Sequence, residues 1–379
     1  MVITFFCFIF ILLYIYWGYP VIIFLFSRLA NKEVRKGVYE PKVTILITAY
    51  NEENHIEATI KNKLILSYPR NKMEIIVISD GSEDRTDEIV SAFACQGVKL
   101  FRQEPRRGKT SALNMAVPQA TGDILVFSDA NSIYDKDALR YLMENFADSA
   151  VGYVTGNMVY VNSDGTTIGD GCSAYMKYEN FLRHYETQVG SIVGVDGGID
   201  AVRRFLYRPM NADQLPDFVL PLMVVEQGYR VIYEPRALLK EETLKSSEDE
   251  YRMRVRVSLR ALWALWDMQK LLNPNRYGIF SFQLLSHKVL RYLGIVFMVG
   301  AYIFNIFILP CSRLFQILFL LQSLFYGAAL AGNVLEKRGK SSRFLYIPYY
   351  FCLINIAAGH ALIRLLRGEK QVLWTPRKG

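Results

Sequence analysis

Three short apolar runs, each ending in polar residues, constrain the fold of this chain most strongly. They begin at Val43, Glu74 and Asp123 and are rich in isoleucine and valine. Each run is too short for a buried helix, and the pattern is typical of strands in a parallel sheet covered on both faces. Helical patterns follow these runs at 53–66, 86–93, 110–117 and 136–146. The sequence therefore predicts an α/β fold.

The ends of the three predicted strands carry polar and acidic residues. They are Tyr50, Asn51 and Glu52, then Asp80, then Asp129 and Asn131. Ligands of parallel sheets collect at the carboxyl ends of the strands. Repeated carboxylates at one edge indicate a cation and, through it, phosphate groups. Helix capping explains Asp84 and Thr86 well, but it does not explain Asp80 at the strand end.

A lysine follows a glycine at the start of the third helical pattern. The sequence Gly108-Lys109-Thr110 suggests a P-loop, but that motif needs a glycine where this chain has Gln103. We therefore reject the P-loop. Lys109 can still contact a phosphate at the start of a helix.

Long apolar segments lie near both ends of the chain. Residues 3–26 carry no charged side chain and are long enough to cross a bilayer, which takes roughly 20 residues. They lack the basic start and small-residue cleavage site of a signal peptide, so we expect a retained anchor. The basic residues that follow place the next part of the chain in the cytoplasm. Three further apolar runs lie at 289–309, 314–332 and 344–363.

The orientation of the last apolar run is left open by the charges around it. The loop 336–340 is basic and therefore expected in the cytoplasm, so the last run should leave it. The tail that follows is also basic, with Arg364, Arg367, Lys370, Arg377 and Lys378. Either the last run is re-entrant or interfacial, or the tail departs from the charge rule.

Charge and cysteine usage narrow the class of protein. The net charge of +8 comes largely from residues beside the apolar segments, so we expect no nucleic-acid partner. The five cysteines are scattered, which indicates a reducing compartment and no disulfide framework. Arginines and tryptophans within 251–285 favour the headgroup zone of a membrane, with an ordinary packed helix as the alternative.

We therefore predict five parts of the chain. They are a transmembrane anchor (1–27), a cytoplasmic catalytic domain (38–250), amphipathic interfacial helices (251–285), C-terminal transmembrane helices (286–366) and a basic tail (367–379).

Four motifs in order resemble those of the family 2 glycosyltransferases. They are Thr48-Ala-Tyr-Asn-Glu52, Ser79-Asp-Gly-Ser-Glu-Asp-Arg-Thr86, Gly108-Lys-Thr-Ser-Ala-Leu-Asn114 and Asp129-Ala-Asn131. The resemblance spans about 40–270 and is strongest to the membrane-bound branch, which includes cellulose, hyaluronan and poly-N-acetylglucosamine synthases. It implies a GT-A fold, a Rossmann-like nucleotide-diphospho-sugar transferase domain, with flanking transmembrane helices. It also implies a UDP-sugar as donor.

The resemblance implies a role for each strand-end residue. Thr48, Tyr50 and Glu52 match the first strand end that contacts the nucleotide, Asp80 matches the acid that contacts the nucleoside, and Lys109 matches a basic residue near the nucleotide. Asp129 matches the first acid of the DXD motif, which holds Mg²⁺ or Mn²⁺ on the diphosphate. Asn131 replaces the second acid; its amide oxygen can coordinate a metal but carries no charge.

Inverting transfer also needs a carboxylate that takes the proton of the acceptor hydroxyl. In the family this is the Asp of a TED motif. The strand signature Gly228-Tyr-Arg-Val231 puts Asp217 in this position, with Pro216 in place of the preceding acid. Asp213 is the second candidate, and a helix N-cap is the alternative role for Asp217.

Two more features bear on the acceptor side. The turn at Gly197-Gly198 resembles one that allows close backbone approach, while Asp196 and Asp200 beside it are either functional or capping. Of the QxxRW motif of processive members, only Arg260 is kept. Arg260 either contacts the diphosphate or faces lipid headgroups.

Together these features predict an inverting, multi-pass glycosyltransferase of the inner membrane. Its cytoplasmic domain would move sugar from a UDP-sugar to a growing cell-surface polysaccharide. One alternative is single transfer onto a lipid-linked acceptor. The other, motivated by Asn131 and the altered TED motif, is a non-catalytic subunit of a synthase complex. The expected partners are the donor, the acceptor, the bilayer and, in that last case, other synthase subunits.

Overall fold

The computed structural model describes residues 1–161, 167–242, 247–338 and 342–373. The chain forms two compact units, which we call the sheet unit and the helical unit. The sheet unit holds 27–161, 176–242 and 371–379, and the helical unit holds 1–26, 162–175 and 243–370. Of the basic residues considered above, Lys340, Arg377 and Lys378 lie outside the described residues.

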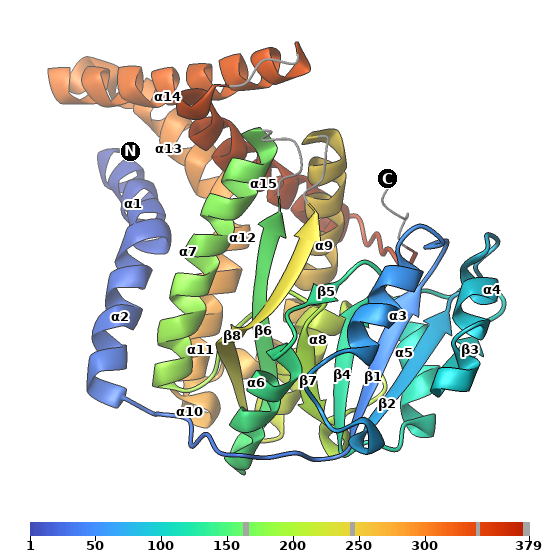
Figure 1. Ribbon diagram of the computed structural model, residues 1–379. Coiled ribbons are helices and arrows are strands. Elements are labelled where there is room, and N and C mark those ends of the chain that lie inside the picture. Colours follow the sequence, from blue (N-terminus) through green and yellow to red (C-terminus); the bar gives the residue numbers. More distant parts are fainter. Residues whose placement is uncertain (162–166, 243–246, 339–341, 374–379) are drawn as a thin grey trace. The chain divides into compact units, whose positions relative to one another are not determined.

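An eight-stranded mixed sheet forms the centre of the sheet unit, in the order β3-β2-β1-β4-β7-β6-β8-β5. The three predicted strands are β1 (Val43–Ala49), β2 (Met73–Ser79) and β4 (Ile124–Asp129). They are neighbours and parallel, as Figure 1 shows, with β3 (Val98–Arg102) added beside β2. Every residue of β1 and β2 is buried, which confirms that the sheet is covered on both faces.

The other half of the sheet brings antiparallel strands next to β4. The strand β7 (Asp200–Arg203) runs antiparallel to both β4 and β6 (Val151–Val161). The strand β8 (Arg230–Glu242) is parallel to β6 and pairs with the short β5 (Ile133–Tyr134). The sequence did not predict β7, because four residues are too few to show a strand pattern.

The four predicted helices of the sheet unit all form. They are α3 (Ile56–Leu64), α4 (Thr86–Ser91), α5 (Lys109–Ala116) and α6 (Ala138–Glu144). The sheet unit also contains the end of α7 (Thr167–Val189) and α8 (Pro216–Glu226). The carboxylate of Asp84 accepts hydrogen bonds from the backbone N–H groups of Thr86 (3.0 Å) and Glu53 (3.1 Å). This geometry confirms that Asp84 stabilises the start of α4.

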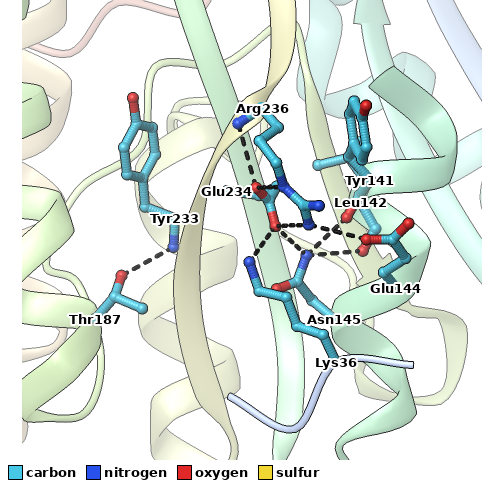
Figure 2. A network of polar contacts seen from close by, with 9 residues as sticks. All are labelled: Lys36, Tyr141, Leu142, Glu144, Asn145, Thr187, Tyr233, Glu234 and Arg236. Atoms are coloured by element: carbon cyan, nitrogen blue, oxygen red, sulfur yellow. Dashed lines mark hydrogen bonds and ion pairs between the residues drawn. The ribbon is translucent and has the colours of Figure 1, made fainter. Parts of the chain in front are cut away.

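A buried ion network ties the edge of the sheet unit together (Figure 2). Glu234 on β8 is fully buried and pairs with Lys36 at 2.6 Å and Arg236 at 2.8 Å. It also accepts a hydrogen bond from Asn145 (2.9 Å), and Arg236 reaches Glu144 at 2.9 Å. Burial raises the pKa of Glu234, but the bonds from Arg236, Lys36 and Asn145 outweigh it and lower the pKa to about 2.

The helical unit contains the expected apolar helices. Among the described residues, four stretches are long and apolar enough to cross a membrane: Val2–Ala30, Gly294–Cys311, Arg313–Lys337 and Phe344–Leu366. They correspond to α1 (Val2–Leu13) continued by α2 (Tyr19–Ala30), and to α13 (Gly294–Ile308), α14 (Arg313–Lys337) and α15 (Arg343–Leu366). Their orientation in a bilayer stays a prediction.

The expected interfacial segment forms α9 (Ser247–Asp267), followed by the short helices α10 (Pro274–Tyr277), α11 (Ile279–Leu284) and α12 (Leu290–Tyr292). Leu259 and Leu262 of α9 pack against Ala361 of α15. One face of α9 is therefore used for packing inside the protein, as the alternative interpretation required. A position at the membrane surface stays a prediction.

Candidate active site

Lys109, the first residue of α5, lies between two carboxylates. Its Nζ is 2.8 Å from Asp129 Oδ1 and 3.4 Å from Asp217 Oδ1. Burial lowers the pKa of Lys109, but Asp129 and Asp217 outweigh it, so the pKa is raised above its ordinary value. Lys109 is therefore a permanent cation that brings together three of the residues predicted from the sequence.

The two carboxylates come from different elements of the sheet unit. Asp129 is the last residue of β4 and is 37% exposed, and Asp217 lies in the first turn of α8 and is 22% exposed. Leu215 occupies the N-cap of α8, so the alternative role of Asp217 as the N-cap residue is wrong. Both carboxylates therefore face the same ammonium group, and both are partly exposed.

A glycine turn runs directly against both carboxylates. Gly197 and Gly198 have φ values of +80° and +76°, which side chains rarely tolerate. A Cβ on Gly197 would lie 2.8 Å from Asp217 Oδ2, and a Cβ on Gly198 would lie 3.6 Å from Asp129 Oδ2. The close backbone approach expected from the sequence is thus present, and the turn forms one wall of the site.

The two acids beside this turn have different surroundings. Asp196 forms a bidentate ion pair with Arg183, whose Nε also donates to the Gly194 carbonyl (3.2 Å). This pair anchors the loop before the glycine turn. Asp200 is fully buried on β7, opposite Thr155. Burial first, then Asp217, raises the pKa of Asp200 well above its ordinary value. The carboxyl group of Asp200 therefore keeps its proton to a higher pH than an ordinary aspartate does.

Asp80 at the end of β2 fixes the turn that leads to Lys109. Its buried carboxylate accepts hydrogen bonds from the backbone N–H groups of Arg107 (2.9 Å) and Gly108 (3.0 Å) and from Gln103 Nε2 (2.5 Å). The sequence did not show this anchoring role, because the loop 103–108 folds back onto β2 only in three dimensions. The expected contact of Asp80 with a nucleoside stays a prediction.

Tyr50 and Arg106 are in contact at the end of β1. The guanidinium of Arg106 lies 3.4 Å from the ring centroid of Tyr50. Thr48 is buried in β1, and Glu52 contacts His55 Nδ1 at 3.0 Å at the start of α3. Sequence reasoning missed Arg106, for which its place two residues before Gly108 was the one available signal. Arg106 also lies 3.6 Å from the Asp80 carboxylate, so it links the end of β1 to the end of β2.

The residues at the end of β4 fit a hard divalent cation. Within the described ranges, no group of three or more His, Cys, Asp or Glu side chains is arranged to hold a metal alone. Mg²⁺ is commonly held by one or two carboxylates together with substrate phosphates. Asp129 and the amide oxygen of Asn131 supply such ligands, while the Asn131 Nδ2 donates to Glu241 at 3.4 Å.

Arg260 is the one predicted site residue that belongs to the helical unit. It is buried on α9, with 6% of its surface exposed. Its expected contact with the diphosphate stays a prediction.

Comparisons with known proteins now bear on this site. Residues 44–208 match the family model for glycosyl transferase family 2. The chain is 32% identical over 244 residues to the poly-β-1,6-N-acetyl-D-glucosamine synthase of Staphylococcus aureus, which covers 61% of this chain and 59% of that protein. It is 30% identical over 231 residues to the probable glycosyltransferase YdaM of Bacillus subtilis. That match covers 57% of this chain and 54% of YdaM. The chain thus spans somewhat more than half of these curated relatives.

A solved structure shares the fold over nearly the whole chain. It is a mannosyltransferase from Pyrobaculum calidifontis, in complex with GDP-mannose and Mn²⁺, with a TM-score of 0.73 at 23% identity. The match covers 94% of this chain and 97% of that chain. The GT-A-like fold and the resemblance expected from the sequence are confirmed.

Proposed function

We propose, from the match of residues 44–208 to the model of glycosyl transferase family 2, that this chain is an inverting membrane glycosyltransferase. It transfers a sugar from a nucleotide-diphospho-sugar to an acceptor hydroxyl. The observation that carries the proposal is the position of Lys109 between Asp129 and Asp217, at 2.8 Å and 3.4 Å. A donor-binding acid, a phosphate-binding cation and a candidate base thereby share one site.

Each of these residues has a defined part in the reaction. Asp217 accepts the proton of the acceptor hydroxyl, whose oxygen bonds to the anomeric carbon on the face opposite the leaving group. Asp129, with Asn131, would hold a Mg²⁺ or Mn²⁺ ion that accompanies the diphosphate. When bound, this ion neutralises the charge of the departing nucleoside diphosphate. Lys109 shares that task, because its ammonium is permanently charged and already lies at the site.

The donor and acceptor follow from the expected chemistry and the relatives. We favour a UDP-sugar donor and a growing cell-surface polysaccharide, since a similar protein is named as a poly-N-acetylglucosamine synthase. The four apolar helices support a multi-pass protein with its sheet unit in the cytoplasm. Single transfer onto a lipid-linked acceptor is the second candidate, because only Arg260 of the QxxRW motif is present.

The test is turnover by the purified full-length protein in detergent. Release of nucleoside diphosphate is measured with UDP-N-acetylglucosamine, UDP-glucose and GDP-mannose, in Mg²⁺, Mn²⁺ or EDTA, beside Asp217→Asn. We expect metal-dependent release with one donor that is lost in the variant. Gel analysis of the product then separates a polymer from a single transfer.

A silent wild-type protein would contradict the enzyme proposal if it binds UDP but stays inactive after membrane lipid extract is added. That result would favour the non-catalytic subunit. Activity that appears only with the extract would instead identify a lipid-linked acceptor.

A further inference from the structure

Three side chains on one face of α3 hold the backbone that follows Asp129. They donate to three alternate carbonyl groups of the segment 130–134. The contacts are Thr59 Oγ1 to Ala130 (2.6 Å), Lys63 Nζ to Ser132 (2.6 Å) and Asn62 Nδ2 to Tyr134 (2.8 Å). The spacing of these side chains along α3 places them on the same helix face. The segment that carries Asn131 is therefore fixed from behind at three points.

These three hydrogen bonds set the geometry of the two expected metal ligands. The backbone N–H of Ser132 donates to the Asp129 carbonyl at 3.2 Å and closes a turn over residues 129–132. With the turn closed and its carbonyls held by α3, the side chains of Asp129 and Asn131 keep a fixed separation. Metal sites depend on such outer contacts to orient their ligands.

Lys63 is the unusual member of this set. It is fully buried, its Nζ also donates to Asn62 Oδ1 at 3.1 Å, and it lies 3.5 Å from the ring centroid of Tyr134. Two oxygens and one ring face surround the amino group of Lys63. Burying an amino group is costly, and an apolar side chain would fill the same space at a lower cost. Packing alone therefore does not explain a lysine here.

Tyr134 connects Lys63 to the glycine turn on the other side of the site. Its hydroxyl is 2.6 Å from the Gly198 carbonyl and 2.9 Å from the Phe127 carbonyl. Gly198 belongs to the turn that lies against the Asp217 carboxylate. The stacked pair of Lys63 and Tyr134 thus supports both the Asp129 turn and the glycine turn.

We propose that Lys63 is a positioning residue that holds the Asp129–Asn131 turn in the geometry that binds a divalent cation together with a nucleoside diphosphate. This inference rests on the proposed function. It predicts that loss of Lys63 weakens metal-dependent binding of the nucleotide much more than metal-independent binding. A purely structural lysine would change both equally, or neither.

The test is calorimetric titration of UDP and of GDP into the full-length protein, once with Mn²⁺ and once with EDTA. For Lys63→Met we expect the Mn²⁺-dependent affinity to fall about 10-fold or more, the usual effect of removing an outer contact of a metal site. The affinity in EDTA should change less than about twofold. Lys61→Met is the matched control, because Lys61 is exposed on the same helix and pairs only with Glu57 at 2.6 Å in the described chain. It should bind like the wild type.

Two milder variants keep the test decisive if Lys63→Met does not fold. Lys63→Gln retains a donor without the charge, and Thr59→Val removes one contact to the same segment. Each should weaken Mn²⁺-dependent binding by a smaller factor. A folded variant of Lys63 with wild-type Mn²⁺-dependent affinity, or with equal losses in Mn²⁺ and EDTA, overturns the inference. A wild-type protein that binds neither nucleotide rejects the proposed function itself, and the inference with it.

Discussion

The sheet unit contains two clusters in which carboxylates face a lysine, and the clusters differ in exposure. Glu234 pairs with Lys36 and Arg236 and is fully buried (Figure 2). Asp129 and Asp217, which face Lys109, are 37% and 22% exposed. In the Glu234 network, the loss of one partner should destabilise the fold. In the Lys109 cluster, the exposed carboxylates can be reached by a cation, and we propose that this cluster is the site of chemistry.

The largest expected effect separates these networks by activity. Asp217→Asn keeps the size of the side chain but removes the candidate base, and general bases contribute about 10²–10⁴-fold to rates. We expect turnover to fall by about 10³-fold with little change in melting temperature. The measurement is donor-dependent release of nucleoside diphosphate beside a thermal melt. A variant with more than a tenth of wild-type turnover would remove Asp217 from the mechanism.

The next effect tests whether the glycine turn constrains Asp217 in the Lys109 cluster. In Gly197→Ala the new Cβ would meet Asp217 Oδ2 at 2.8 Å, so the carboxylate or the turn must move. A displacement of about 1 Å in an active site can cost roughly 10²-fold in rate, which is the loss we expect. Gly190→Ala is the matched control, because nothing lies within 4 Å of its added Cβ. Equal activity of the two variants would show that the turn does not constrain Asp217.

For the Glu234 network, we expect a change in stability and not in turnover. Glu234→Gln leaves Lys36 and Arg236 without their buried carboxylate, and we expect a loss of about 2 kcal/mol at pH 7 with unchanged turnover. The loss of stability for fully buried ion pairs is usually larger, but Lys36 and Arg236 are partly exposed. Thermal melts of the two proteins measure this difference. A large loss of turnover in a stable Glu234→Gln protein would contradict the division between the networks.

The pH dependence of that difference has a defined sign. The pKa of Glu234 is lowered to about 2 in the folded protein, against about 4.3 for an unperturbed glutamate. Its stabilisation is therefore present above about pH 4.3 and is lost as the pH falls toward about 2. The melting temperatures of the wild type and Glu234→Gln should converge over this range.

The smallest effect concerns Asp200, which lies near Lys109 and has a raised pKa. Its raised pKa means that the folded protein keeps a proton that the unfolded chain releases above about pH 3.9. This group therefore destabilises the protein as the pH rises above that value. Asp200→Asn should lose no stability at neutral pH and should flatten the dependence of melting temperature on pH. A clear loss of stability at pH 7 would show that the carboxylate is charged and paired.

The sequence predicts the parts of the protein whose pattern is local. The strands β1, β2 and β4, the four helices between and after them, and the apolar helices each have a periodicity or composition that can be read directly. Asp129, Lys109 and Asp217 were found because they follow strands or match motifs, and the structure brings these three together.

The features missed by the sequence depend on distant contacts. Lys63 looks like a surface lysine in a helical pattern, and its role depends on a carbonyl 69 residues away in the sequence. Arg106 shows its contact with Tyr50 only after the loop 103–108 folds back. The hydrogen bonds by which Asp80 anchors that same loop were missed for the same reason.

We propose that the Lys109 cluster, and not the Glu234 network, takes a cation together with the nucleotide. Electron paramagnetic resonance of Mn²⁺ tests this without knowledge of the sugar or the acceptor. The wild-type protein, Asp129→Asn and Glu234→Gln are each titrated with Mn²⁺ in the presence of UDP. We expect bound Mn²⁺ in the wild type and in Glu234→Gln, and its loss in Asp129→Asn. Equal Mn²⁺ binding by Asp129→Asn and the wild type would contradict the proposal.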